Sequence, residues 1–300
     1  MAFRNLYIEN PAKLSIKRNH LIILQDEEYS IPIEDIQSVM IENRQCTITA
    51  PALSLLAENQ VALYTCDARY LPCAVLLPLG NHSRKLQVLE QQLSLQKRVK
   101  KRIWQKIVKQ KIINQAKCLE LTNKNGVSEL LALASKVEEG DRTFCESQAA
   151  KIYFLELFGE GFTRRQDNTQ NAALNYGYAL VRGVLARDIC AHGLESALGV
   201  FHHNELNAFN LADDLIEPFR PYIDLWVSNN VYYTDLMLTG KNKRELFSLL
   251  SSKVDIDQEI HSLTSALRKT TASFSTCCKN NSASWIKLPE LIPLSIHEYD

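Results

Sequence analysis

The sequence lacks the patterns that mark several classes of protein. None of its eight cysteines forms a Cys-x-x-Cys pair, which argues against zinc knuckles and against a disulfide framework. No apolar run is long enough to cross a bilayer, and the first residues, MAFRNLY, are not an apolar signal segment. Gly240-Lys241 lacks the rest of a phosphate-binding P-loop, so nucleotide hydrolysis is not indicated. We therefore expect a cytoplasmic protein with no membrane association.

The chain also has no net charge, because 34 Lys and Arg balance 34 Asp and Glu, but the two signs are segregated. Residues 83–117 hold eleven basic side chains and one acidic side chain, whereas residues 118–300 hold 17 basic and 24 acidic ones. Apolar residues recur at helical spacing through residues 82–121, so the basic residues follow the polar side of a predicted helix. Only Glu90 balances them, and uncompensated lysines three or four residues apart destabilise a helix.

This basic stripe predicts a polyanionic partner, and double-stranded DNA is the expected one. A solvated basic face and a membrane surface are the alternatives, and we favour them less. The side chains predicted to bind DNA are Arg84, Lys85, Lys97, Arg98, Lys101 and Arg102.

A length of 300 residues suggests about two domains. Up to about residue 80, short β-branched runs at residues 14–16, 21–24, 29–33, 36–41 and 46–49 alternate with turn residues, and one short helix is predicted at residues 51–58. From residue 82 onward, helical patterns continue almost to the end. We predict an α+β fold, with a small β-rich domain at residues 1–80 followed by a larger all-helical catalytic domain at residues 81–300.

Residues 199–221 carry a group of candidate metal ligands. His202 and His203 are adjacent, and three carboxylates follow at Asp213, Asp214 and Glu217. If residues 207–217 form a helix, these carboxylates lie on or near one face, where like charges repel. A divalent cation would relieve that repulsion, and an upstream histidine would complete its ligand set. The alternative is a histidine pair in a loop beside an acidic helix face in contact with water.

A further carboxylate candidate is Glu146. The small residues Ala149 and Ala150 follow it, and they would allow a helix to pack closely enough to hold the carboxylate near another element. Taken alone, Glu146 has the character of an ordinary surface glutamate.

Four motifs in order resemble one family. They are Glu146-x-x-Ala-Ala-x-x-Tyr-Phe, Asn175-Tyr-Gly-Tyr-Ala-Leu, Gly199-x-x-His and Asp214-Leu-Ile-Glu-Pro-Phe-Arg-Pro. Together they resemble the CRISPR adaptation endonuclease–integrase, the spacer-acquisition subunit of CRISPR systems, and most of all its type II branch. The resemblance extends over essentially the whole chain.

The resemblance implies a site for Mg²⁺ or Mn²⁺ held by Glu146, His202 and Glu217. His203 is the near alternative to His202, and Asp214 matches a second acidic position outside the ligand set. The mixed nitrogen and oxygen donors are compatible with either ion.

The resemblance also implies an activity and partners. The expected enzyme is a metal-dependent DNA endonuclease and integrase that inserts short foreign DNA segments, called spacers, into a CRISPR array by attack of a DNA 3′-hydroxyl. It would work as a homodimer with a small ferredoxin-like CRISPR adaptation partner protein. Two alternatives stay open: a DNA-binding scaffold without catalysis, and a non-haem iron enzyme that uses His202, His203 and a carboxylate.

Overall fold

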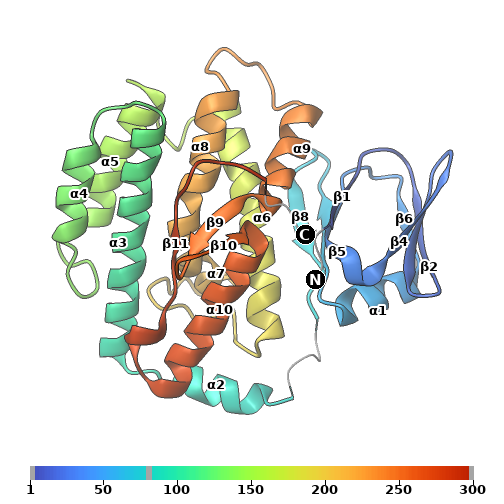
Figure 1. The fold of residues 1–300 in the computed structure, drawn as a ribbon, viewed down its shortest axis with the longest axis horizontal. Helices are drawn as coiled ribbons and strands as arrows, with labels where there is room; N and C mark the ends of the chain where they lie inside the picture. Colours follow the sequence, from blue (N-terminus) through green and yellow to red (C-terminus); the bar gives the residue numbers. More distant parts are fainter. Residues whose placement is uncertain (1–3, 79–82, 297–300) are drawn as a thin grey trace. The chain divides into compact units, whose positions relative to one another are not determined.

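A computed structural model describes residues 4–78 and 83–296 of the chain (Figure 1). The chain divides into two compact units, the first formed within Met1–Ser83 and the second within Arg84–His297. The first is rich in strands and the second is mainly helical, so the prediction of an α+β fold with a β-rich N-terminal part is confirmed. The predicted boundary between residues 80 and 81 lies outside the described residues.

The first unit contains two four-stranded sheets. One sheet consists, in spatial order, of β1 (Arg4–Ile8), β5 (Ile36–Ile41), β7 (Ala62–Cys66) and β8 (Pro72–Val75). Its first three strands are parallel, and β8 is antiparallel to β7. The other sheet consists of β4 (Glu28–Pro32), β3 (His20–Leu24), β2 (Lys13–Lys17) and β6 (Thr47–Ile48). Here β2 and β6 are parallel and the remaining pairs are antiparallel.

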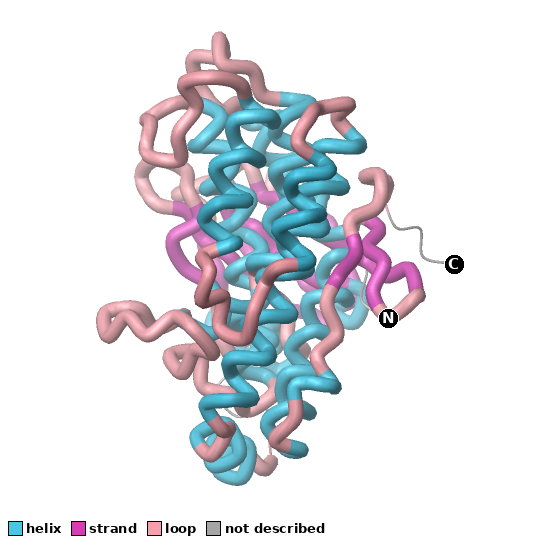
Figure 2. The backbone as a smooth tube through the Cα atoms, turned by 90° about the vertical axis from the view of Figure 1, so that its left-hand side faces the viewer, coloured by secondary structure: helices cyan, strands magenta, loops and turns pink. Residues whose placement is uncertain are grey.

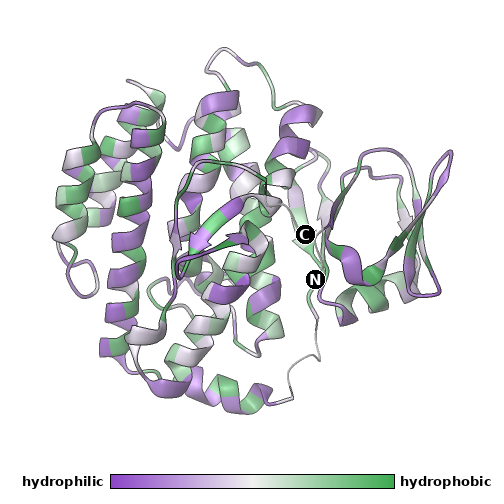
Figure 3. Cartoon of the chain, in the orientation of Figure 1, coloured by the Kyte–Doolittle hydropathy of each residue, from purple (hydrophilic) through white to green (hydrophobic). Residues whose placement is uncertain are grey.

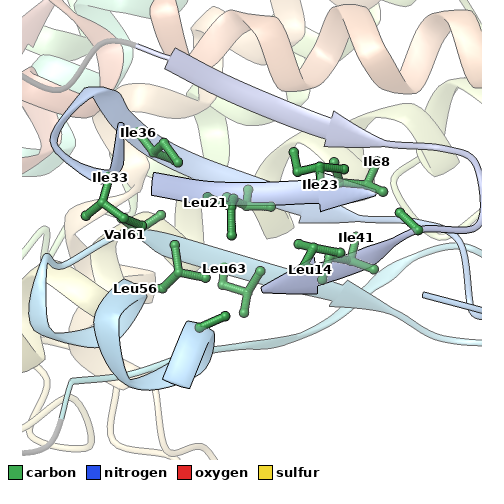
Figure 4. Close-up of a cluster of buried hydrophobic side chains, with 13 residues drawn as sticks. Ile8, Leu14, Leu21, Ile23, Ile33, Ile36, Ile41, Leu56, Val61 and Leu63 are labelled. Carbon is green, nitrogen blue, oxygen red and sulfur yellow. The ribbon is translucent and has the colours of Figure 1, made fainter. Parts of the chain in front are cut away.

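Aliphatic side chains from both sheets form the core of the first unit (Figure 4). Strand β5 is buried along its whole length, as expected for a strand with parallel neighbours on both sides. Leu14 and Leu21 from the other sheet are fully buried. Helix α1 (Ala50–Glu58), which has Pro51 in its first turn, adds Leu56 to this core. Each such side chain stabilises the fold by about 1.5–3 kcal/mol.

The second unit is built from long helices that lie roughly side by side (Figure 2). Helix α3 packs against α4, α5 and α8, while α6 packs against α8, α9 and α10. The α-helices are α2 (Lys85–Leu93), α3 (Lys97–Leu121), α4 (Val127–Ser135), α5 (Cys145–Phe158), α6 (Thr169–Ala191), α7 (Asn210–Leu215), α8 (Arg220–Asn230), α9 (Gly240–Ser248) and α10 (Leu263–Asn280). The 3₁₀ helices of the chain are η1 (Ile33–Asp35), η2 (Glu217–Phe219), η3 (Leu249–Ser251) and η4 (Ala283–Trp285). Across the described ranges, no helix is both long and apolar enough to cross a membrane.

The prediction that the second domain is all-helical is wrong. A three-stranded antiparallel sheet, in the order β10 (Glu259–Ser262), β9 (Lys253–Ile256) and β11 (Pro289–Glu290), lies within it. Val254 and Ile256 alternate with less buried residues, which is the period of a strand. Asp257 and Gln258 both have positive φ, 62° and 63°, and they form a tight hairpin turn where a helix was predicted.

The basic segment is also not one continuous helix, because Ser94, Leu95 and Gln96 separate α2 from α3. Along α2, Leu86 and Leu93 are 70% and 60% exposed, and Gln92 is buried instead. The Gln92 amide donates to the carbonyls of Glu195 and Leu198, and its oxygen accepts from the Glu195 N–H. Burial of Gln92 therefore satisfies the backbone of a loop, which apolar spacing alone does not indicate.

Candidate active site

A buried lysine lies between two of the predicted site residues. Lys111, on α3, places its Nζ 2.6 Å from Oε1 of Glu146 and 2.5 Å from Oε2 of Glu217. The side chains of Lys111 and Glu217 are only 10% and 7% exposed. Two carboxylates that are far apart in sequence therefore converge on a single cationic position.

The charges of this cluster stabilise one another. Burial alone would lower the pKa of Lys111, but the carboxylates of Glu217 and Glu146 outweigh that effect and raise it. Burial alone would likewise raise the pKa of Glu217, but Arg220 and Lys111 bring it down to about 2. The Arg220 Nε lies 2.9 Å from Oε1 of Glu217. Glu217 is therefore an ionised carboxylate at neutral pH, held between two cations.

Helix α3 holds the backbone next to Glu217 in place. Glu217 begins η2, separated from the end of α7 only by Ile216, and Pro218 is the next residue. The buried Asn114 amide donates to the Pro218 carbonyl at 2.7 Å and to the Pro289 carbonyl at 2.9 Å. Because Asn114 is three residues after Lys111, both side chains lie on the same face of α3. One face of α3 therefore contacts both the Pro218 carbonyl and the Glu217 carboxylate of η2.

Glu146 is positioned by the start of α5. The Asp141 carboxylate accepts hydrogen bonds from the backbone N–H groups of Cys145 and Glu146, at 2.9 and 3.1 Å, and so caps the helix. A carboxylate in the first turn is stabilised by the helix dipole. Ala149, one turn later, is fully buried, as its small size predicted.

His202 is oriented by Asp214, which is fully buried on α7. Oδ1 of Asp214 accepts from His202 Nδ1 at 2.6 Å and from the His202 backbone N–H at 3.1 Å. Its Oδ2 accepts from the N–H groups of Val200 and Phe201. The hydrogen bond to Asp214 raises the pKa of His202. A Cβ at Gly199 would lie 2.3 Å from the His202 carbonyl oxygen, so the Gly-x-x-His spacing is required by this turn.

His202 and Glu217 line the same pocket, which has a volume of about 420 Å³. His203 lines a different pocket. Since His202 uses Nδ1 to bind Asp214, its Nε2 is the ring nitrogen available for a ligand. The residues that line the pocket with His202 and Glu217 are Arg164, Asn175, Tyr178, Ala179, Arg182, Asp213, Ile216 and Arg220.

The expected crowding of three carboxylates on one helix face is wrong. Helix α7 ends at Leu215, before Glu217, so the carboxylates diverge. Asp213 pairs with Arg182 at 2.7 Å, Asp214 binds the turn that carries His202, and Glu217 pairs with Lys111 and Arg220. Each carboxylate has its own partner, so repulsion between them does not require a metal.

The predicted metal ligands differ in how closely they come together. Within the described residues, no three His, Cys, Asp or Glu side chains come together as a metal-holding group. Glu146 and Glu217 nevertheless share one ammonium group, and His202 lies in the pocket of Glu217. Two carboxylates and an imidazole are donors that Mg²⁺ and Mn²⁺ accept. The donor chemistry therefore fits, and the three-residue metal site remains a prediction.

The basic side chains of α3 fall into paired and unpaired groups. Figure 3 shows hydrophilic and hydrophobic residues alternating along this helix. Arg98 and Arg102 face Glu139, with nitrogen–oxygen distances of 3.9 and 2.7 Å, so the expectation that only Glu90 balances the stripe is wrong. Lys97 and Lys101 are exposed and form no ion pair with any residue that the structure describes. Arg84 and Lys85, at the start of α2, are exposed as well.

Sequence reasoning missed Lys111 and Arg220 as parts of the site. One signal was present for Lys111: it follows Ile103 and Ile107 at intervals of four residues, so it continues the buried stripe of the helix rather than the solvated face. A lysine on a buried stripe predicts a buried carboxylate partner. Arg220 carried the weaker signal of standing three residues after Glu217.

A family model and a full-length relative both match this chain. A family model described as CRISPR associated protein Cas1 matches residues 6–237. The CRISPR-associated endonuclease Cas1 of Neisseria meningitidis serogroup C (strain 8013) is 44% identical over 304 residues, which cover 100% of both chains.

Solved structures with low sequence identity show the same fold. A casposase bound to integration product has a TM-score of 0.73 at 19% identity, covering 94% of this chain and 92% of that one. A Cas6-RT-Cas1–Cas2 complex has a TM-score of 0.70 at 17% identity, covering 95% of this chain and 36% of that one. The family that the four motifs predicted is confirmed by the model and by the full-length relative. The chain belongs to the Cas1 family of CRISPR-associated proteins.

Proposed function

We propose that this protein is a metal-dependent DNA endonuclease and integrase that joins short DNA segments to a CRISPR array by phosphoryl transfer. The observation that carries the proposal is the convergence of Glu146 and Glu217 on one cationic position, next to the pocket of His202. The endonuclease name of the meningococcal relative and the integration product in the casposase structure support it.

The ion would be Mg²⁺ or Mn²⁺, held by Glu146, His202 and Glu217. When bound, it would supply Lewis-acid stabilisation of a phosphate under attack. Asp214 holds the His202 ring in one orientation and leaves Nε2 available. Arg220 stacks on Tyr178, with its guanidinium carbon 4.4 Å from the ring centroid, and it presents a fixed positive charge to a phosphate in the pocket. Lys111 keeps the two carboxylates together by charge.

The partners belong to the same proposal. They are double-stranded DNA, a second copy of this chain and a small ferredoxin-like adaptation protein. A fold neighbour that is named as a Cas6-RT-Cas1–Cas2 complex supports a protein partner of this kind.

A joining assay tests the proposed function. A branched DNA presents a free 3′-hydroxyl beside a target phosphodiester, so that no partner is needed to bring the reacting ends together. We expect joined product with Mn²⁺ or Mg²⁺ and none in EDTA. Binding without joining under any divalent ion would favour the scaffold alternative, and oxygen consumption that depends on Fe²⁺ would favour the iron enzyme.

The division of α3 into paired and unpaired cations predicts which residues bind duplex DNA. Each phosphate contact contributes about −0.9 to the slope of log affinity against log salt. Replacing Lys97 and Lys101 by Gln should therefore make the slope less steep by about 2. The matched control replaces Arg98 and Arg102, which share the one carboxylate of Glu139, and should change the slope less. Anisotropy titrations measure both, and equal slopes for wild type and the lysine variant would contradict the prediction.

A further inference from the structure

A buried carboxylate outside the candidate pocket links three helices of the second unit. Asp224, on α8, is only 1% exposed and does not line the pocket. Its Oδ2 accepts a hydrogen bond from the Tyr153 hydroxyl at 2.9 Å, and its Oδ1 accepts one from the Tyr178 hydroxyl. Tyr153 lies on α5, which also carries Glu146, and Tyr178 lies on α6. One carboxylate therefore joins α5, α6 and α8.

The Asp224 carboxylate is charged although no cation contacts it. Among the described residues, its side-chain partners are the two phenols, and none of them is a lysine, an arginine or a histidine. Burial raises the pKa of Asp224 to about 6, and the two hydroxyls oppose that rise, so the group is ionised at neutral pH. A buried charge is costly, and neutral side chains could link the same helices. The negative charge is therefore more than packing requires.

The Tyr178 ring connects that charge to the candidate pocket. The guanidinium carbons of Arg220 and Arg164, which both line the pocket, lie 4.4 and 5.4 Å from the ring centroid. Arg164 also donates to Oδ1 of Asn175, one turn before Tyr178 on α6, at 2.7 Å. A phenol that donates to an anion is polarised, which makes its ring more negative and strengthens its contacts with cations. Asp224 therefore strengthens the hold of this ring on both arginines.

The contact between Tyr178 and Asp224 depends on a close crossing of α6 and α8. Gly177 precedes Tyr178, and Ile223 precedes Asp224. A Cβ on Gly177 would lie 2.4 Å from Cγ2 of Ile223, so the two helices touch at the residues next to the hydrogen-bonded pair. The glycine therefore allows the Tyr178 hydroxyl to reach a carboxylate on the neighbouring helix.

We propose that Asp224 is a positioning residue for DNA joining, which acts through the Tyr178 ring to hold Arg220 and Arg164 against a phosphate in the pocket. The inference rests on the proposed function, because that phosphate is the one under attack in the joining reaction. Asp224 itself touches no reacting atom. Tyr153 makes the same kind of hydrogen bond to Asp224 but does not line the pocket, so it supplies a matched control.

The first test separates positioning from packing with the full-length protein and the branched DNA. Tyr178→Phe and Tyr153→Phe each remove one hydrogen bond to Asp224 and should lower the melting temperature by similar amounts. Tyr178→Phe and the isosteric Asp224→Asn should slow joining at saturating DNA by about tenfold, which is the effect that a cation–π contact can supply. Tyr153→Phe should join at close to the wild-type rate. Equal slowing by the two phenylalanine variants, or an unchanged rate in Asp224→Asn, would overturn the proposal.

A triple variant removes the effect of stability from this comparison. Tyr153→Phe, Tyr178→Phe and Asp224→Leu together delete both donors and the acceptor, so no buried polar group of the network is left unpaired. This variant should melt near the wild-type temperature and still join slowly. Joining at the wild-type rate by the folded triple variant would show that the network only packs the helices, and would reject the positioning role.

A spectroscopic measurement in EDTA without DNA keeps the inference separate from the proposed function. The NMR signal of the Arg220 Nε–H, assigned with Arg220→Lys, senses the Tyr178 ring beneath the guanidinium. It should shift in Asp224→Asn and stay in place in Tyr153→Phe. An unchanged signal in Asp224→Asn would contradict the proposal. Failure of wild type to join DNA, together with the expected shift, would reject the proposed function and leave the link from Asp224 to Arg220 standing.

Discussion

Replacing Glu217 with Gln should reduce metal-dependent joining and cleavage by about 10³-fold or more, because a neutral amide replaces the carboxylate at the centre of the site. Loss of an outer partner of a bound metal typically costs 10–100-fold, and loss of a direct ligand should cost more. DNA affinity should stay close to that of wild type, since the unpaired lysines of α3 are unchanged. Product formation is measured over a titration of Mn²⁺, and DNA binding is measured by anisotropy.

This variant also removes the counter-charge of two buried cations. Lys111 and Arg220 would lose the carboxylate that both contact, and breaking a buried pair costs about 3–5 kcal/mol of stability. The double variant Lys111→Met with Glu217→Gln removes one of those cations and should melt nearer to the wild-type temperature. If it does so and stays inactive, the loss is chemical rather than structural. Full activity of Glu217→Gln with Mn²⁺ would refute the assignment.

The adjacent histidines supply an internal comparison for the same assay. His202 lies in the pocket of Glu217 and His203 does not. We expect His202→Ala to lose activity by a much larger factor than His203→Ala. A larger loss of activity in His203→Ala than in His202→Ala would identify His203 as the imidazole ligand instead.

The strands of the first unit could be predicted from the sequence because their signal is local. The β-branched run at Ile36–Ile41 coincides with β5, residue for residue. Its partner β1 was not predicted, because the parallel pairing of Arg4–Ile8 with β5 depends on residues about 30 positions away. The break after α2 was missed for a similar reason, since the Gln96 N–H at the break donates to Oδ1 of Asn281, 185 positions away.

The candidate site was predictable only through its motifs. Glu146 has no local feature that distinguishes it from a surface glutamate, and its contact with Lys111 depends on how α5 packs against α3. The role of Gly199 depends on the folded turn, because the His202 carbonyl oxygen and then the Asp214 carboxylate occupy the space where its side chain would be. Residue spacing predicted a shared helix face for Asp213, Asp214 and Glu217. This prediction was wrong because α7 ends at Leu215, before Glu217.

A donor strand that ends in a 3′-deoxynucleotide should bind normally but give no joined product. The reason is the chemistry of the candidate pocket: among the described residues that line it, Tyr178 alone carries a hydroxyl, and there is neither a serine nor a cysteine. The Tyr178 hydroxyl donates to the buried Asp224. Burial, and then the charge of Asp224, raise the pKa of Tyr178 well above its ordinary value, so its phenol stays protonated and is a poor nucleophile.

No hydroxyl or thiol of the pocket is therefore suited to attack phosphorus, and we expect the nucleophile to be a DNA 3′-hydroxyl in joining or water in cleavage. The branched DNA with a 3′-deoxy end removes the first nucleophile and leaves the second. Joining should fall below detection, cleavage should persist, and affinity should match that of the unblocked DNA. A Tyr178→Phe variant keeps the ring that stacks on Arg220 and should still join unblocked DNA. Joined product from the blocked strand, or protein linked covalently to DNA through tyrosine or serine, would show instead that the protein supplies the attacking group.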